Sequence, residues 1–184
     1  MKKYLLVTLL LLSACSPSSR FFQLPPVSDN AAISSRRMSI GIEEVNVPQY
    51  LDRPQMVLSR AEHNEMRFSE FNRWVEPLSA GMSRVLADDI ASYMPKSVVK
   101  PKNYASEKFD YTVDVEVNKF DAILRHQVSM DAWWTISKRG KVVARGRTKL
   151  ESKLQKWGYE AIVEEQNYMI NKMARQIVEE LVKL

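Results

Sequence analysis

The chain offers few side chains from which a catalytic centre could be built. Nucleophilic catalysis needs a base beside the nucleophile, and the only imidazoles belong to His63 and His126. His63 lies in a polar stretch, where we interpret it as a solvated side chain. The sequence contains neither a G-x-S-x-G elbow nor an H-E-x-x-H helix, and its five glycines leave little material for a phosphate-binding loop. We therefore predict that the protein is not an enzyme and holds no cofactor or metal.

Two pairs of adjacent acidic residues could supply a general acid and a general base. They are Asp88-Asp89 and Glu179-Glu180, and both fall in stretches with helical periodicity. Neighbouring side chains on a helix point to different sides, so neither pair can converge on one substrate atom. We therefore expect these carboxylates to lie on solvated helix faces.

The only cysteine, Cys15, has a different chemistry available to it. It follows two lysines, at positions 2 and 3, and a nearly unbroken apolar run from Tyr4 to Leu12. That run is far shorter than the roughly 20 residues that cross a bilayer, so it is typical of a secretory signal and not of a membrane span. The ending Leu12-Ser13-Ala14-Cys15 resembles the lipobox of bacterial lipoproteins. The resemblance implies cleavage after residue 14 and acylation of Cys15.

The residue after Cys15 bears on the destination of the protein. It is Ser16 and not aspartate, which in enteric-type lipoproteins implies export to the outer membrane. We therefore expect a signal peptide over residues 1–14 that is removed, an acylated cysteine with a polar linker over 15–20, and a single periplasmic domain over 21–184. The alternative is an ordinary secretion signal in which Cys15 is incidental.

Composition limits the partners and the redox chemistry. Removing Lys2 and Lys3 with the signal peptide lowers the basic count from 27 to 25, against 22 acidic residues, so the mature charge is about +3 by subtraction. This mild excess gives no reason to expect a nucleic-acid partner. Because the chain has one cysteine, the domain can form no internal disulfide and must rely on its hydrophobic core.

Hydrophobic periodicity predicts two helices and several strands. Apolar residues recur every three or four positions from Leu78 to Met94 and from Tyr159 to Leu184. Pro77 suits the first turn of the first helix, where its missing N–H costs nothing. Alternating apolar residues predict strands at 39–47, 109–118, 128–136 and 142–150, a short strand at 21–24, and a hairpin of 55–59 with 65–68. The fold class is therefore α+β, a two-layer sandwich in which both helices pack on one face of a small mixed, mostly antiparallel sheet.

The stretch from Lys138 to Lys156 is strongly basic. It contains Lys138, Arg139, Lys141, Arg145, Arg147, Lys149, Lys153 and Lys156 against Glu151 alone, a net of +7. Arg145, Arg147 and Lys149 have strand spacing and share one face. One interpretation is a surface that meets anionic lipid headgroups or an acidic partner. The other, which we favour, is cross-strand pairing with the acidic face of the strand from Asp110 to Glu116.

Two adjacent tryptophans must face opposite sides of their strand. If Trp134 follows Val128, Met130 and Ile136 into the core, Trp133 is left on the other face. A large exposed aromatic residue suggests a binding surface, although loops of the same chain could also cover it. The candidate interface therefore consists of Trp133, Arg145, Arg147 and Lys149.

Five short motifs carry a resemblance to a known family. In chain order they are Phe21-Phe22-Gln23-Leu24-Pro25, Val47-Pro48-Gln49-Tyr50-Leu51, Trp74-Val75-Glu76-Pro77-Leu78, Val117-Asn118-Lys119-Phe120-Asp121 and Gly158-Tyr159. This order resembles the PqiC lipoproteins, the auxiliary lipoproteins of ABC-type and MCE-type lipid transport systems. The resemblance covers nearly the whole mature chain and implies a small mixed sheet with two helices.

The resemblance also implies a function and partners. It implies a non-enzymatic component at the outer-membrane end of an intermembrane phospholipid transport system that maintains the envelope. The implied partners are an MCE-domain protein anchored in the inner membrane (PqiB-like), further copies of the same chain in a homo-oligomeric ring, and phospholipid. The alternative is a structural or assembly lipoprotein of the envelope that binds proteins without handling lipid.

Overall fold

The computed structural model describes residues 18–27, 30–60, 65–102 and 108–184. Cys15, the expected signal peptide and His63 lie outside these ranges. The expected division of the chain into signal peptide, linker and domain therefore stays a prediction.

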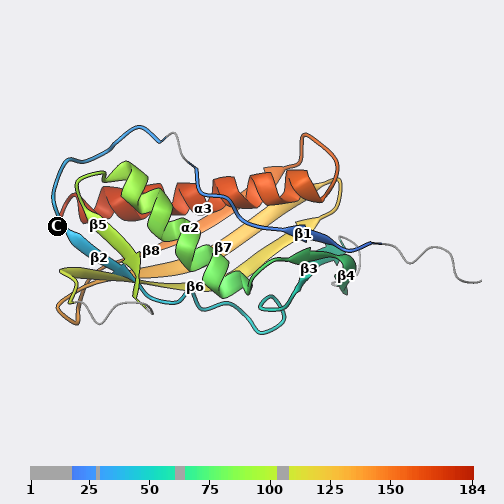
Figure 1. Ribbon diagram of the computed structural model, residues 1–184, viewed down its shortest axis with the longest axis horizontal. Helices are drawn as coiled ribbons and strands as arrows, with labels where there is room; N and C mark the ends of the chain where they lie inside the picture. The colour runs from blue at the N-terminus through green and yellow to red at the C-terminus, as the bar shows by residue number, and fades with distance from the viewer. Residues whose placement is uncertain (1–17, 28–29, 61–64, 103–107) are drawn as a thin grey trace, which may run out of the picture.

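The described residues form one mixed sheet with two helices on one of its faces (Figure 1). The sheet has eight strands, and the helices pack against each other as well as against the sheet. The elements are β1 (Arg20–Phe22), β2 (Ser39–Ile42), β3 (Gln55–Arg60), β4 (Glu65–Trp74), α2 (Leu78–Tyr93), β5 (Val98–Pro101), β6 (Tyr111–Ile123), β7 (Gln127–Lys138), β8 (Lys141–Lys153) and α3 (Tyr159–Leu181). The predicted α+β class, both helices and the 55–59/65–68 hairpin are confirmed.

The topology centres on β6. One edge of β6 pairs with β7 along nearly its whole length, and β7 pairs in turn with β8. The other edge is shared by β2 and β3, which extend to β5 and to β4 and β1. Four of the seven pairings are parallel, namely β1 with β4, β2 with β5, β2 with β6 and β3 with β6.

The expectation of a mostly antiparallel sheet was therefore wrong. Only the hairpin β3–β4 and the meander β6–β7–β8 are antiparallel, although their ladders are the longest. The remaining partners are separated in sequence by long connections, which include α2 in every case except β1 with β4, and such crossovers return the chain in the same direction. Alternation predicts a strand but not its neighbour, so the sequence did not reveal these pairings. It also missed β5, whose sequence Val-Val-Lys-Pro is short and half exposed.

The central strand β6 alternates between core and solvent as predicted, but it is longer. Val113 and Val115 are fully buried, whereas Asp114 and Glu116 are exposed. The register shifts between Val117 and Lys119, after which the strand continues to Ile123. A bulge breaks the period of two, and the predicted strand stopped at 118 for that reason.

The helices close the core over the sheet. The 23 residues of α3 span about 35 Å, and its apolar stripe, including Ile170 and Met173, is fully buried. Pro77 is the N-cap of α2 and precedes its first helical residue, so it does not lie inside the first turn as predicted. Asp52 accepts a hydrogen bond from the Ser79 N–H (3.1 Å), which satisfies one of the unpaired amides at the start of α2.

One predicted surface carboxylate is in the core. Asp88 is exposed as expected, but Asp89 is fully buried. The Val27 N–H donates to Asp89 Oδ1 at 2.8 Å. Burial raises the Asp89 pKa to about 6, and the Asp88 charge adds to this, whereas the Val27 N–H and the side chain of Asn171 act in the opposite direction. The prediction failed because α3 and the N-terminal segment, both distant in sequence, cover this side of α2.

A buried tryptophan joins β7, β8 and α3. Trp134 lies against Gly146 so closely that a Cβ at position 146 would overlap the indole ring. Its Nε1–H donates to Thr148 Oγ1 at 3.2 Å, and the Thr148 hydroxyl donates to Gln176 Oε1 at 2.5 Å. Position 146 must therefore be glycine to leave room for the indole ring. The two hydrogen bonds connect Trp134 on β7 to Gln176 on α3 through Thr148.

Replacing Gly146 by alanine should lower the free energy of unfolding by about 1–3 kcal/mol, because the added methyl overpacks the Trp134 site. Urea unfolding of Gly146→Ala measures the loss. In the double variant Gly146→Ala/Trp134→Leu the two costs should not add, because the smaller side chain leaves room for the methyl. Additive losses would contradict the proposed overlap.

Stability should depend on pH through Asp89. Its folded pKa of about 6 lies above that of an unfolded aspartate, so the folded state binds the proton more tightly and stability falls as pH rises through this window. Between pH 4 and pH 7 the difference in unfolding free energy between the native chain and Asp89→Asn should fall by on the order of 2–3 kcal/mol. Asp88→Asn, at the exposed neighbour, is the matched control and should track the native chain. A pH-independent difference for Asp89→Asn would contradict the assignment.

Candidate functional site

The segment that follows the predicted acylation site is tied to the fold at once. We call residues 18–27 the anchor strap. Arg20 pairs with Glu160, and the Phe22 ring lies 6.1 Å from that of Tyr159 at the start of α3. The Val75 N–H donates to the Phe22 carbonyl at 2.9 Å. The chain is therefore fixed to both β4 and α3 within a few residues of Cys15.

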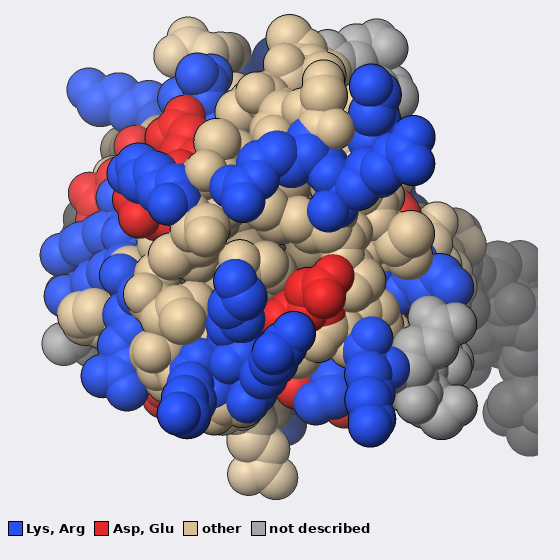
Figure 2. Space-filling model, turned by 90° about the vertical axis from the view of Figure 1, so that its left-hand side faces the viewer, with Lys and Arg blue, Asp and Glu red and all other residues tan. Residues whose placement is uncertain are grey.

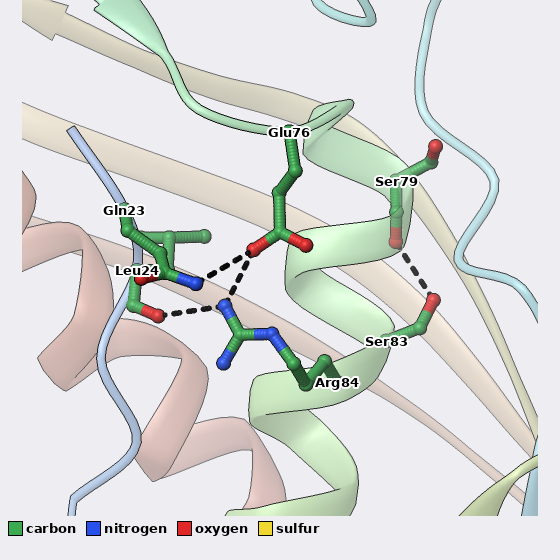
Figure 3. A network of polar contacts seen from close by, with 6 residues as sticks. All are labelled: Gln23, Leu24, Glu76, Ser79, Ser83 and Arg84. Carbon is green, nitrogen blue, oxygen red and sulfur yellow. Dashed lines mark hydrogen bonds and ion pairs between the residues drawn. The ribbon is translucent and has the colours of Figure 1, made fainter. Parts of the chain in front are cut away.

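A polar network fixes the next part of the anchor strap to α2 (Figure 3). Arg84 Nη2 donates to the Leu24 carbonyl at 3.1 Å and to Glu76 Oε1 at 2.5 Å. The Gln23 amide also points at Glu76 Oε1, at 3.4 Å. One turn away, the Ser83 hydroxyl donates to the Ser79 carbonyl at 2.7 Å. A charged and partly buried arginine thus holds the strap by its backbone.

This junction gives a physical role to three of the five family motifs. The motif 21–25 forms the strap, 74–78 supplies Glu76, and 158–159 supplies the Tyr159 ring. Trp74 is buried beneath them. The resemblance identified these motifs, but it did not predict that they contact one another, because they lie far apart along the chain.

The anchor strap begins at the end of the molecule on the right of Figure 1, and aromatic side chains near it are exposed. We call this end the anchor-side end. Phe21 is 62% exposed and Trp157 is 77% exposed, and Phe68 and Phe71 on β4 are also exposed. The guanidinium of Arg125 lies 5.2 Å from the Trp157 ring. Aromatic and cationic side chains together are typical of surfaces that meet lipid headgroups.

A hollow of about 350 Å³ opens at the same end. It is lined by Leu58, Ser59, Arg60, Arg67, Ile123, Leu124 and His126. Arg60 and Arg67 each contact Glu65 at 3.2 Å, and the arginines hold the pKa of that carboxyl below its usual range. His126 thus borders an open hollow beside two arginines that share one carboxylate.

The four predicted interface residues all lie on the outer face of the sheet, away from the helices. Glu116, Trp133 and Arg147 stand side by side on β6, β7 and β8. Trp133 is 47% exposed, and the Arg147 guanidinium lies 5.1 Å from its ring. Arg145 and Lys149 flank Arg147 on β8 and are exposed. The geometry brings the set together, and its role as an interface stays a prediction.

The predicted pairing of the basic strand β8 with the acidic face of β6 was wrong. β7 lies between β8 and the acidic strand β6, so direct cross-strand pairing between them cannot occur. Arg147 instead pairs bidentately with Asp131 on β7, at 2.8 and 2.6 Å. This hydrogen bonding holds the pKa of Asp131 below its usual range. Asp131 was missed because opposite charge was matched between the two outer strands of the predicted meander, and the acidic residue on the middle strand was not considered as the partner.

The described residues contain no group of three or more His, Cys, Asp or Glu side chains that could hold a metal ion. Among the same residues, no helix is both long enough and apolar enough to cross a bilayer.

Comparison with known proteins identifies the family. A family model described as ABC-type transport auxiliary lipoprotein component matches residues 22–178. The chain belongs to the ABC-type transport auxiliary lipoprotein family. This confirms the resemblance drawn from the five motifs. Because it is a family of lipoproteins, membership implies a lipid anchor in the cell envelope.

Solved structures agree on the fold. A crystal structure described as an uncharacterized protein is 22% identical, with a TM-score of 0.76 over 90% of this chain and 99% of that chain. A DUF330 protein from Xanthomonas campestris is 13% identical, with a TM-score of 0.71 over 87% of this chain and 93% of that one. A PelC dodecamer from Paraburkholderia phytofirmans is 9% identical, covers 78% of this chain and 90% of its own, and has a TM-score of 0.45, too low to bear on assembly here. A search of curated proteins found no match.

Removing Arg84 should loosen the anchor strap. In Arg84→Met the Leu24 carbonyl and Glu76 lose their shared donor, so amide hydrogen exchange in residues 23–27 should rise at least roughly fivefold, with a stability loss of about 1 kcal/mol. Arg175→Met, which removes the exposed Arg175–Glu179 pair on α3, is the matched control and should leave exchange in the strap unchanged. Equal exchange in both variants would show that the network does not hold the strap.

Proposed function

We propose that this protein is acylated at Cys15 and acts, without catalysing a reaction, as an outer-membrane-anchored periplasmic component of an MCE-type and ABC-type phospholipid transport system. The observation that carries this proposal is the anchor strap. Its contacts fix the chain to α2, α3 and β4 directly after the predicted acyl site. A lipid on Cys15 would therefore be joined to the folded domain by a short linker and not by a long flexible one.

The anchor-side end supports attachment to a lipid surface. Four residues separate Cys15 from Arg20, and the five Cα-to-Cα steps between the two span at most about 18 Å. Phe21 and Trp157 consequently stay close to the bilayer that holds the lipid, where aromatic rings are stabilised at the headgroup level. Arg60, Arg67 and Arg125 at the same end favour an anionic lipid surface.

The outer face of the sheet supplies a surface for protein partners. Trp133 with its stacked Arg147 is the kind of aromatic and arginine pair that is enriched at the centres of interfaces. We propose that this surface, with Arg145 and Lys149, contacts either the next copy in a homo-oligomeric ring or the MCE-domain protein anchored in the inner membrane. The exposed edge strand β8 lies beside it.

A second candidate is a structural lipoprotein of the envelope that never handles lipid. The observation that favours it is the filled core, in which Phe120, Met130 and Ile170 close the space between sheet and helices. A phospholipid would therefore bind at the surface. Stoichiometric phospholipid extracted from purified Cys15→Ser chain would favour the carrier, and its absence would favour the structural component.

The acyl anchor can be tested directly. The native chain should incorporate labelled palmitate and fractionate with the outer membrane, and Cys15→Ser should do neither. Ser16→Asp is the matched control, because it keeps the thiol and should retain palmitate while moving the protein to the inner membrane. Crosslinking in cells should recover an MCE-domain protein with the native chain. Unchanged membrane association of Cys15→Ser would overturn the proposal.

A further inference from the structure

The end of the molecule opposite the anchor strap is crowded with lysine and arginine. Figure 2 looks at this end, which lies on the left of Figure 1, and blue side chains dominate it. β2, β5, β6 and β8 begin here, while β7 and both helices end here. We define the distal basic end by six exposed residues from four segments: Arg37, Lys96, Lys108, Lys138, Arg139 and Lys141.

Contacts between separate segments hold this end together. The Ser97 hydroxyl donates to the Arg36 carbonyl at 2.9 Å, and Arg36 Nη1 donates to the Val182 carbonyl at 2.8 Å. The Lys138 ammonium lies 5.0 Å from the Tyr111 ring. The cations are therefore displayed on a fixed scaffold.

Internal carboxylates leave most of this charge uncompensated. Asp110 accepts hydrogen bonds from the Ser39 N–H at 3.0 Å and the Ser39 hydroxyl at 2.7 Å. Glu43 pairs with Lys102, and Glu180 pairs with Lys183 at 2.5 Å. None of the six residues of the distal basic end forms an ion pair with a carboxylate of the described ranges. Hydrogen bonds from Ser39 hold the pKa of Asp110 below its usual range, and the charges of Arg139 and Lys138 add to this, but one carboxylate does not balance six cations, so this end attracts external anions.

A hollow of about 450 Å³ lies within this end. Lys102, Lys108 and Arg139 border it, with Phe109 and Thr112 forming the rest of the wall beside Asp110. Three cations around one concave surface can receive the carboxylate side chains of a partner, and the Phe109 ring can cover their aliphatic part.

The short linker from Cys15 disfavours the bilayer that holds the acyl chain as this partner, because in an upright molecule the distal basic end points away from that bilayer. The helix α3 runs from the anchor strap, at Glu160, to the distal basic end, where Val182 meets Arg36. Its length of about 35 Å separates the two ends, whereas the linker from Cys15 spans at most about 18 Å. Turning the distal basic end toward the membrane would need a longer linker. Among the described residues, the large exposed apolar side chains at this end are the aliphatic Val98, Val142 and Val143, whereas the anchor-side end exposes aromatic rings.

We infer that the distal basic end docks an acidic protein surface, presented from the periplasm and inserting carboxylate side chains between Lys108 and Arg139. This inference rests on the proposed anchor at Cys15 for its orientation. It adds to the outer face of the sheet a second docking surface, at the free end of the proposed transport component, and it defines the partner at that surface by charge.

The test uses the Cys15→Ser chain in solution with two probes. One is a fluorescent synthetic peptide of alternating Glu and Ser, and the other is a vesicle of phosphatidylethanolamine and phosphatidylglycerol at about 3:1. The distal variant is Lys138→Gln/Arg139→Gln/Lys141→Gln. The matched control, Lys153→Gln/Lys156→Gln/Lys172→Gln, loses the same charge elsewhere on the surface, at exposed or partly exposed positions outside both proposed interfaces. Thermal unfolding first establishes that both variants fold.

The distal variant should bind the peptide roughly tenfold more weakly than the parent at low salt, and the control within about twofold. An equal loss in both variants, or no loss in either, would overturn the inference. If the distal variant lost vesicle binding but kept peptide binding, the surface would be one that binds lipid. That result would also overturn the inference. Because the chain here carries no acyl group, these outcomes are independent of the palmitate and fractionation measurements that test the anchor.

Discussion

The packing of α3 along the sheet is the constraint on which the rest of the structure depends. Its buried stripe contributes several fully buried side chains, each stabilising the fold by about 1.5–3 kcal/mol. The Trp134–Thr148–Gln176 hydrogen bonds fix its position against β7 and β8. The helix contacts the anchor strap at its start, and the residue after its end, Val182, accepts a hydrogen bond from Arg36. It therefore sets the distance between the two ends of the molecule.

That separation makes the protein chemically polarised. The anchor-side end exposes Phe21 and Trp157 beside arginines, whereas the described residues of the distal basic end expose mainly lysine and arginine, with Phe109 partly exposed in its hollow. The outer face of β7 and β8 lies between them and presents Trp133 with Arg147. A lipid-held end, a lateral surface and a charged free end together form the arrangement expected of a component that stands on one membrane and receives a partner from the periplasm.

Local patterns in the sequence predicted the elements but not their partners. The alternation in β6, the opposite orientation of the two tryptophans and the apolar stripe of α3 follow from side-chain periodicity, so they were predictable. The parallel pairings of β2 and β3 with β6, the burial of Asp89 and the Arg147–Asp131 pair depend on segments that are distant in the chain. The distal basic end was seen only in part, since its Arg37, Lys96 and Lys108 lie outside the basic stretch that the sequence displays.

If Cys15 is acylated, the anchor-side end faces the membrane and the distal basic end faces away from it. Cys15 is the only cysteine, so a cysteine introduced into the acylated chain at Arg139 or at Lys156 can carry a single fluorescent donor. Energy transfer to a headgroup acceptor in reconstituted vesicles then reports the height of each position. With the anchor at Cys15, energy transfer should be strong from position 156 and weak from position 139. The reason is that the length of α3, about 35 Å, separates the two ends of the molecule. Equal transfer from both positions, or stronger transfer from 139, would contradict this orientation.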